Sequence, residues 1–157
     1  MKKQSRLLLL FLAAVALLIA GCAHIISSES RRLAAKNIPF QWIAQNPDRY
    51  KGIMVIWGGQ IIETRNLPEG TLIVVLQRPL GRFEQPLEDS RPQGRFLVLY
   101  QGFLDPAVYE KGEMITVAGI IEGEKVMPLG EIEYRYPYLN AREIHLWMPD
   151  EMSQYYY

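Results

Sequence analysis

Few side chains in this 157-residue chain are of the types that carry out acid–base or metal chemistry. The two histidines, His24 and His145, lie far apart in the sequence, and Cys22 is the single cysteine. A zinc site needs three or four ligands that converge on one point. We therefore expect neither a metal site nor a cofactor. His145 lies between two apolar residues, Ile144 and Leu146, and we interpret it as a half-buried strand residue.

A pair of carboxylates is the next candidate for chemistry. Glu131 and Glu133 alternate onto one face of an expected strand, and two acids so placed could do general acid–base work. Charges at a sheet edge also discourage aggregation, and we favour that role for the pair. The chain has neither the G-x-S-x-G pattern of hydrolases nor the G-x-x-x-x-G-K-[ST] pattern of phosphate-binding loops. These observations predict a protein that is not an enzyme, with an envelope hydrolase using Glu131, Glu133 or His145 as an alternative.

Aromatic residues form a third candidate group. Tyr134, Tyr136 and Tyr138 alternate onto one face of an extended segment, where rings could stack on sugars. The candidate ligand face comprises Trp57, Tyr100, Phe103, Tyr134 and Tyr136. Packing in a barrel core would explain the same rings, so both interpretations stay open at this point.

The elements that must position these residues are mostly strands. Apolar segments rich in β-branched residues predict strands at 53–64, 71–80, 95–104, 114–123 and 131–149. The last segment gives one strand or two, interrupted at Pro137. Paired glycines at 58–59 predict a bulge or a sharp bend in the first strand.

Two short helices are expected beside the strands. Phe40, Ile43 and Ala44 share one face of a helix before the first strand. A second helix, between the third and fourth strands, is predicted by the Asp-Pro pair at 105–106 and by Gly112. This order predicts an all-β fold, an OB-fold-like Greek-key barrel of five or six strands, with a β-sandwich as the alternative.

The barrel domain is predicted to span residues 39–149. Residues 150–157 are expected to be a loose carboxy-terminal tail, and residues 22–38 a modified amino-terminus and tether. The tether, fully extended, would reach about 50 Å, so the domain could stand away from a surface. A helix packed on the domain is the alternative for residues 23–37.

The first 21 residues have the pattern of an export signal. Lys2, Lys3 and Arg6 precede fourteen apolar residues, Leu7 to Ala20. A helix of that length measures about 21 Å, which is short of the roughly 30 Å of a bilayer core. A basic start, a short apolar run and small residues after it are typical of a cleaved secretory signal.

The end of this signal resembles the lipobox of bacterial lipoproteins. Ile19, Ala20 and Gly21 precede Cys22. The resemblance implies that the Cys22 thiol receives a diacylglyceryl group by a thioether bond and that cleavage makes Cys22 the first mature residue. Several acyl chains on one residue would anchor the protein stably. Ala23, where an aspartate would imply retention in the inner membrane, implies the outer membrane, while a signal anchor with an incidental cysteine is the alternative.

The charge balance argues against a nucleic-acid partner. Removal of Lys2, Lys3 and Arg6 with the signal leaves 14 basic and 17 acidic side chains in 136 residues, a net charge near −3. Nucleic-acid binding would call for a basic patch. We expect outer-membrane lipid, through acylated Cys22, and an envelope protein as partners.

Several strings together resemble one family. They are WGGQII (57–62), GRF (94–96), GFLDPAVY (102–109), ITVAGIIEG (115–123), YRYPYLNA (134–141) and IHLW (144–147). With the lipobox, they resemble the Slp family, the starvation-inducible outer-membrane lipoproteins of Gram-negative bacteria. The resemblance implies a lipid-anchored protein on the periplasmic face of the outer membrane, with a structural or stationary-phase stress role, and no catalytic residue. A periplasmic module that binds a glycan or small molecule on the aromatic face is the alternative.

Overall fold

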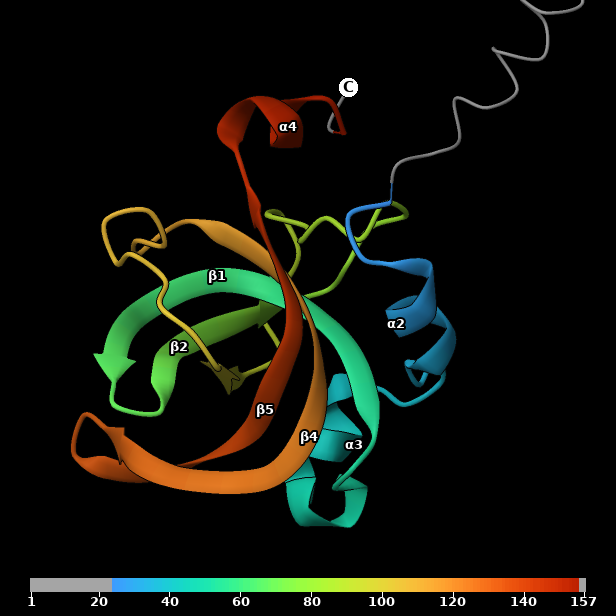
Figure 1. The fold of residues 1–157 in the computed structure, drawn as a ribbon. Helices are drawn as coiled ribbons and strands as arrows, with labels where there is room; N and C mark the ends of the chain where they lie inside the picture. The colour runs from blue at the N-terminus through green and yellow to red at the C-terminus, as the bar shows by residue number, and fades with distance from the viewer. Residues whose placement is uncertain (1–23, 156–157) are drawn as a thin grey trace, which may run out of the picture.

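The chain folds into a closed five-stranded barrel (Figure 1). A computed structural model describes residues 24–155. The strands are β1 (Met54–Leu67), β2 (Gly70–Arg78), β3 (Arg95–Tyr100), β4 (Met114–Leu129) and β5 (Ile132–Trp147). Their order around the barrel is β1-β2-β3-β5-β4, with β3 and β5 parallel and the other neighbours antiparallel. This order confirms the predicted OB-fold-like Greek-key barrel, with five strands.

β5 runs without interruption through Pro137, where the sequence had suggested a break. Up to that residue β5 pairs only with β4, and pairing with β3 begins at Tyr138. Proline, which has no N–H to donate, is tolerated where a strand lacks a neighbour on one side. Of the one or two strands predicted for this segment, the structure has one, because Pro137 lies where β5 is still an edge strand toward β3.

The paired glycines of β1 do not form the expected bulge. The register of β1 against β2 shifts between Ile61 and Glu63 instead. A Cβ on Gly59 would lie 2.0 Å from the carbonyl oxygen of Leu76 on β2. Gly59 thus allows the close approach of two strands, and the bulge lies three residues further on.

The barrel interior is one apolar cluster that includes residues from outside the sheet. Its strand members include Trp57 of β1, Val75 of β2 and Phe96 of β3. The helix α3 (Phe40–Gln45), followed by the 3₁₀ helix η1 (Pro47–Tyr50), adds Phe40 and Ile43, which are 5% and 0% exposed. The predicted helix face at 40–44 is confirmed.

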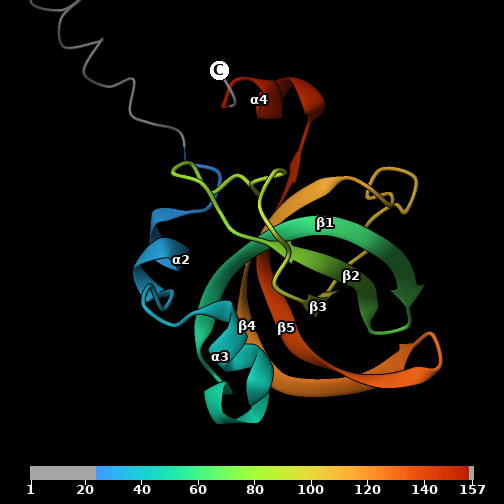
Figure 2. The same cartoon turned by 180° about the vertical axis from the view of Figure 1, so that it is seen from behind.

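No helix forms between β3 and β4 in the described chain. Asp105 accepts hydrogen bonds from the N–H groups of Val108 and Tyr109, which closes one turn. The chain then pairs with β1, since Gly112 N–H donates to the Ile61 carbonyl. The helix predicted at 105–112 is therefore wrong. The helix that packs on the barrel interior is instead α3, which precedes β1 in the chain (Figure 2).

The segment preceding α3 lies against the barrel. Helix α2 (Ser28–Leu33) follows Ile26, which is only 1% exposed. Beyond α2, the Ala35 N–H donates to the Met54 carbonyl at the start of β1. Of the two alternatives predicted for this segment, the structure has a helix packed on the domain rather than a free tether over the described residues 24–37.

The carboxy-terminal segment is also packed, up to Tyr155. Helix α4 (Pro149–Ser153) buries Met152 against Trp147 and Met114. The Glu151 carboxylate accepts from the Met148 N–H at 3.0 Å and caps the helix. The expected loose tail is therefore wrong for residues 150–155. Between residues 24 and 155, no helix combines the length and apolar character that crossing a bilayer requires.

Candidate functional site

The five residues of the candidate ligand face do not meet on one surface. Trp57 points into the barrel, is 7% exposed, and packs edge-on against Phe40 and Phe96 with ring centroids 4.8 and 5.3 Å away. Tyr100 is half-buried and packs on the same interior cluster. Trp57 is therefore a core residue, and Tyr100 lies at the edge of the same cluster, partly exposed.

Tyr134 and Tyr136 lie together on the outer side of the barrel. Their ring centroids are 4.6 Å apart, and Tyr136 packs with Leu72 and Leu97 in a second apolar cluster. The Tyr134 hydroxyl accepts a hydrogen bond from the Arg95 N–H at 3.3 Å. The long β4–β5 hairpin thus folds these rings onto the outer face of β2 and β3.

Phe103 is the most exposed member of the candidate face, at 73%. It lines an open groove of about 450 Å³ between the tip of the β1–β2 hairpin and the loop after β3. The amide side chains of Asn66 and Gln101 line the same groove. Of the predicted aromatic face, Phe103 is thus the residue most open to a ligand in solution.

The residues considered for acid–base or metal chemistry are dispersed. Glu131 and Glu133 are both exposed at the end of the β4–β5 hairpin. His145 packs edge-on against Trp147, and its Nε2 lies 3.4 Å from a Glu151 carboxylate oxygen. His24 is exposed at the start of the described chain. Within residues 24–155, no three His, Cys, Asp or Glu side chains come together as a metal site.

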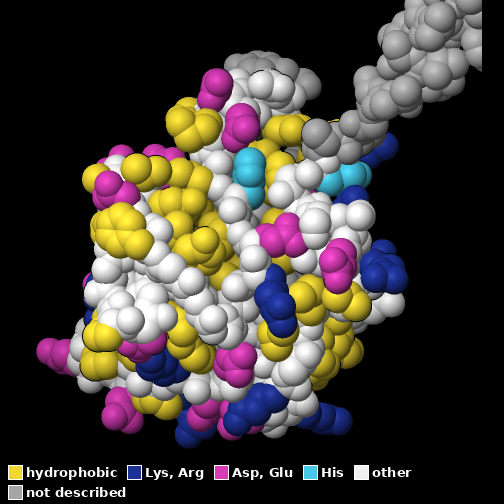
Figure 3. Space-filling model, viewed as in Figure 1, with side chains coloured by type: hydrophobic (Ala, Val, Ile, Leu, Met, Phe, Trp, Pro, Cys, Tyr) yellow, Lys and Arg dark blue, Asp and Glu magenta, His cyan; other side chains and the backbone are white. Residues whose placement is uncertain are grey.

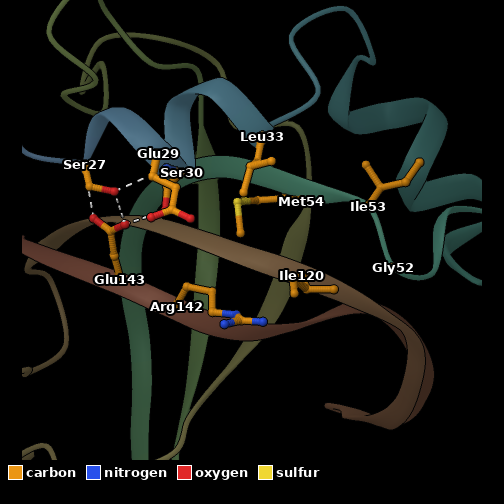
Figure 4. A pocket seen from close by; sticks show the side chains of 10 residues that line it. All are labelled: Ser27, Glu29, Ser30, Leu33, Gly52, Ile53, Met54, Ile120, Arg142 and Glu143. Carbon is orange, nitrogen blue, oxygen red and sulfur yellow. Dashed lines mark hydrogen bonds between the residues drawn. The ribbon is translucent and has the colours of Figure 1, made fainter.

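A group of three hydrogen bonds joins α2 and its N-cap to β5 (Figure 4). One carboxylate oxygen of Glu143 accepts from the Ser27 N–H at 2.8 Å, and the other accepts from the Ser27 hydroxyl at 2.6 Å. The Ser30 hydroxyl donates to that second oxygen as well. We call Ser27, Ser30 and Glu143 the α2 clamp. It lines one end of a groove of about 660 Å³ between α2, β1 and β5.

The electrostatics of the α2 clamp favour an ionised carboxylate. Burial raises the pKa of Glu143, but the three hydrogen bonds from Ser27 and Ser30 outweigh it, so that the pKa lies below the usual value of 4.5. A carboxylate with a low pKa is a weak base. The ionised carboxylate is therefore suited to accept the hydrogen bonds that hold α2 on β5.

Only one part of the α2 clamp has a signal in the sequence. Ser27 is the N-cap of α2, with its hydroxyl accepting from the Ser30 N–H at 3.2 Å, and a serine before a helix is a recognisable start signal. Glu143, which accepts the hydrogen bonds from Ser27, has no such signal, because it lies more than a hundred residues away on the last strand. The lipobox residues Ile19, Ala20, Gly21 and Cys22 lie outside the described residues.

Acidic and basic side chains intermingle over the face of the barrel shown in Figure 3. The ion pairs of the described residues are mostly at the surface, as in Arg65–Glu63 at 3.0 Å and Arg135–Glu124 at 3.0 Å. Exposed pairs of this kind contribute little to stability. The visible surface is thus mixed in charge, as the near-neutral composition suggested.

The fold and site define the class of protein as a small OB-like barrel with a packed amino-terminal extension. A family model described as "Outer membrane lipoprotein Slp family" matches residues 19–157. The chain belongs to this family, and the resemblance noted in the sequence is confirmed. The protein is therefore an outer-membrane lipoprotein.

Individual relatives agree with this assignment. The chain is 29% identical over 135 residues to "Outer membrane protein Slp" of Escherichia coli K12. The aligned region covers 83% of this chain and 69% of the relative. It is 23% identical over 132 residues to "Uncharacterized lipoprotein YeaY" of the same organism, covering 84% and 68%. Among solved structures, a small single-stranded DNA-binding protein from Streptomyces coelicolor aligns with 63% of this chain and 96% of its own, at 18% identity and a TM-score of 0.38.

Proposed function

We propose that this protein is held to the outer membrane by lipid on Cys22 and acts there without catalysis, as a structural or stress-adaptation factor of the envelope. The observation that carries the proposal is the Ile19-Ala20-Gly21-Cys22 sequence, which falls within the family match over residues 19–157. Residues 1–21 would be removed, and the barrel would face the periplasm and contact an envelope protein. The resemblance to starvation-inducible members supports a role in stationary phase.

The lipid anchor is tested by Cys22→Ala in the full-length chain. Without the thiol no thioether can form, so we expect the variant to keep its signal, to incorporate no labelled palmitate, and to leave the outer-membrane fraction. Mass spectrometry of the amino-terminal peptide and membrane fractionation measure these outcomes. Full processing and outer-membrane fractionation of Cys22→Ala would overturn the proposal, and Cys22→Ser controls for the size of the side chain.

The adaptation role is tested in living cells. We expect the protein to accumulate when a culture enters stationary phase, and cells that carry only Cys22→Ala to survive starvation no better than cells without the gene. Crosslinking from the barrel surface in intact cells would capture the envelope partner. Equal survival of starved cells with and without the gene would contradict a stress role.

A second candidate function is the binding of a glycan, and the groove beside Phe103 favours it. An exposed aromatic ring next to the amide groups of Asn66 and Gln101 combines a stacking surface with hydrogen-bonding groups. Titration with soluble cell-wall fragments, followed by calorimetry, tests this candidate. Heat that Phe103→Ala abolishes would support it, and identical titrations of the two proteins would exclude the groove as the site.

A further inference from the structure

The chain between the lipid site and the barrel is short. Ile26 is 1% exposed and Ser27 is held by the α2 clamp, so the chain is attached to the barrel from Ile26 onward. The four residue steps from Cys22 to Ile26 span at most about 14 Å. If the proposed lipid is on Cys22, the end of the barrel around Ile26 lies close to the bilayer, and the stand-off of about 50 Å that a free tether would allow is lost.

The start of the packed chain, at Ile25, lies near the exposed ring of Phe83. Ile25 packs against the apolar cluster of Met114, Trp147 and Met152, and Tyr155 packs on the same cluster. The ring centroid of Tyr155 lies 5.0 Å from that of Phe83. Figures 1 and 2 both show the start of the described chain, α4 and the loop after β2 at the same end of the barrel.

Phe83 is presented on a braced turn. The Gly81 N–H donates to the Gln85 carbonyl at 2.8 Å, and the Phe83 N–H donates to the Gln85 side chain at 3.0 Å. Glu84 has a left-handed backbone, with φ of 67°, and its carbonyl accepts from the Thr116 hydroxyl at 2.6 Å. Because Gln85 is 5% exposed and Thr116 is fully buried, the barrel fixes the direction in which the turn points.

Two neighbouring side chains project from this turn. Phe83 is 41% exposed, and the exposed Arg82 places its guanidinium 5.7 Å from the centre of the Phe83 ring. An aromatic ring paired with a long cationic side chain suits the interfacial layer of a bilayer, where the ring enters the apolar boundary and the cation stays with the headgroups.

We propose that Arg82 and Phe83 form a membrane-contact tip that rests in the leaflet holding the Cys22 lipid. The contact would fix the orientation of the barrel at a second point beside the lipid. The same end of the barrel carries the exposed acidic residue Asp150. We therefore expect the contact to depend on insertion of Phe83 and to be similar in vesicles of phosphatidylcholine alone and in vesicles that also contain phosphatidylglycerol.

The test uses the lipidated full-length protein in such vesicles. Cys22 is the only native cysteine and its thiol would be in the thioether, so Phe83→Cys introduces the only free thiol. An environment-sensitive fluorophore on this thiol is quenched by spin-labelled lipids if the tip enters the bilayer. The matched control is Phe103→Cys, because Phe103 is also an exposed phenylalanine and lies beside the β1–β2 hairpin, away from α2.

We expect quenching severalfold greater at position 83 than at position 103, with a blue-shifted emission at position 83 only. Equal quenching at the two positions, or none at either, would overturn the membrane-contact tip while mass spectrometry still finds lipid on Cys22. If Cys22 carried no lipid, the Phe83→Cys variant would have two free thiols, at positions 22 and 83, and both would react with the fluorophore. That result would refute the anchor, and the membrane-contact tip with it.

Discussion

Helices α2 and α3 are both six residues long and lie along the same flank of the barrel, but they are held by different forces. Helices this short are not stable alone, so each depends on what it contacts. α3 inserts Phe40 and Ile43 into the barrel interior. α2 is held by hydrogen bonds to one carboxylate, Glu143, and by the segments on either side of it, where Ile26 is buried and the Ala35 N–H donates to β1. α3 is thus part of the core. For α2, which contributes no residue to that cluster, we expect detachment to be possible while the barrel stays folded.

The largest expected effect is on the α3 side of this comparison. Phe40→Ala removes a ring that is 5% exposed and packs against Trp57 and Phe96, so the free energy of unfolding should fall by about 3–5 kcal/mol. Urea denaturation followed by circular dichroism measures this loss. Trp42→Ala is the control in the same helix, since Trp42 is 61% exposed and should change stability by less than about 0.5 kcal/mol. A loss for Phe40→Ala as small as that for Trp42→Ala would contradict the stabilising role of α3 in the core.

The next effect concerns the α2 clamp. Glu143→Ala removes the acceptor of three hydrogen bonds, and docking of α2 should weaken by about 1–3 kcal/mol. We expect faster amide hydrogen exchange in residues 26–35, with unchanged exchange in the barrel strands. Arg142→Ala, at the neighbouring exposed position, is the control. Faster exchange throughout β5 in Glu143→Ala would mean that the clamp supports the barrel as well as α2.

A smaller effect is expected for the N-cap. Ser27→Ala removes the cap of α2 and one donor to Glu143, but leaves the Ser27 N–H and the Ser30 hydroxyl in place. The expected cost to α2 docking is about 1 kcal/mol. Limited proteolysis near α2 measures it, with Ser28→Ala as the control. A Ser27→Ala protein as resistant as the parent would show that Glu143 alone is sufficient.

The smallest effect follows from pH. Because the pKa of Glu143 is below 4.5 when α2 is docked, the undocked state binds the proton more readily, and the contribution of the ionised carboxylate to docking is fully present above 4.5. As pH falls through the lowered pKa, the carboxylate becomes neutral and its hydrogen bonds lose about half of their strength. Hydrogen exchange in residues 26–35 should therefore rise below pH 4.5, after correction for intrinsic rates. Glu143→Gln should lack this step, and the same step in Glu143→Gln would assign it to another group.

The strands and α3 could be predicted from sequence because their signals are local. The face formed by Phe40, Ile43 and Ala44 and the apolar runs of β1 to β5 each reflect burial against the same interior. The Asp-Pro pair at 105–106 predicted a helix that does not form, and the reason is physical. Asp105 does cap a turn, with its carboxylate accepting from the Ala107 N–H at 2.9 Å, but the chain that follows pairs with β1 instead of continuing as a helix.

The α2 clamp and the membrane-contact tip could not be predicted from the sequence. Each depends on residues that are brought together only when the barrel closes, such as Ser27 with Glu143 or Phe83 with Tyr155. The five aromatic residues of the candidate ligand face do not share one surface, and the sequence could not show this for the same reason. Period-two alternation placed Tyr134 and Tyr136 on one side of β5, but could not show that Trp57 points to the inside of the barrel.

The parallel pairing of β3 with β5 has a consequence for how the domain is made. That seam consists of three residue pairs, from Leu97–Tyr138 to Leu99–Asn140, and it joins segments about forty residues apart. Contacts so distant in sequence form late, because the intervening chain must first be ordered. A chain synthesised from its amino-terminus thus exposes the edge of β3 until β5 emerges, and such an edge invites pairing with other chains. Any product truncated before Ile132 would be an open sheet, prone to aggregation and a substrate for envelope proteases.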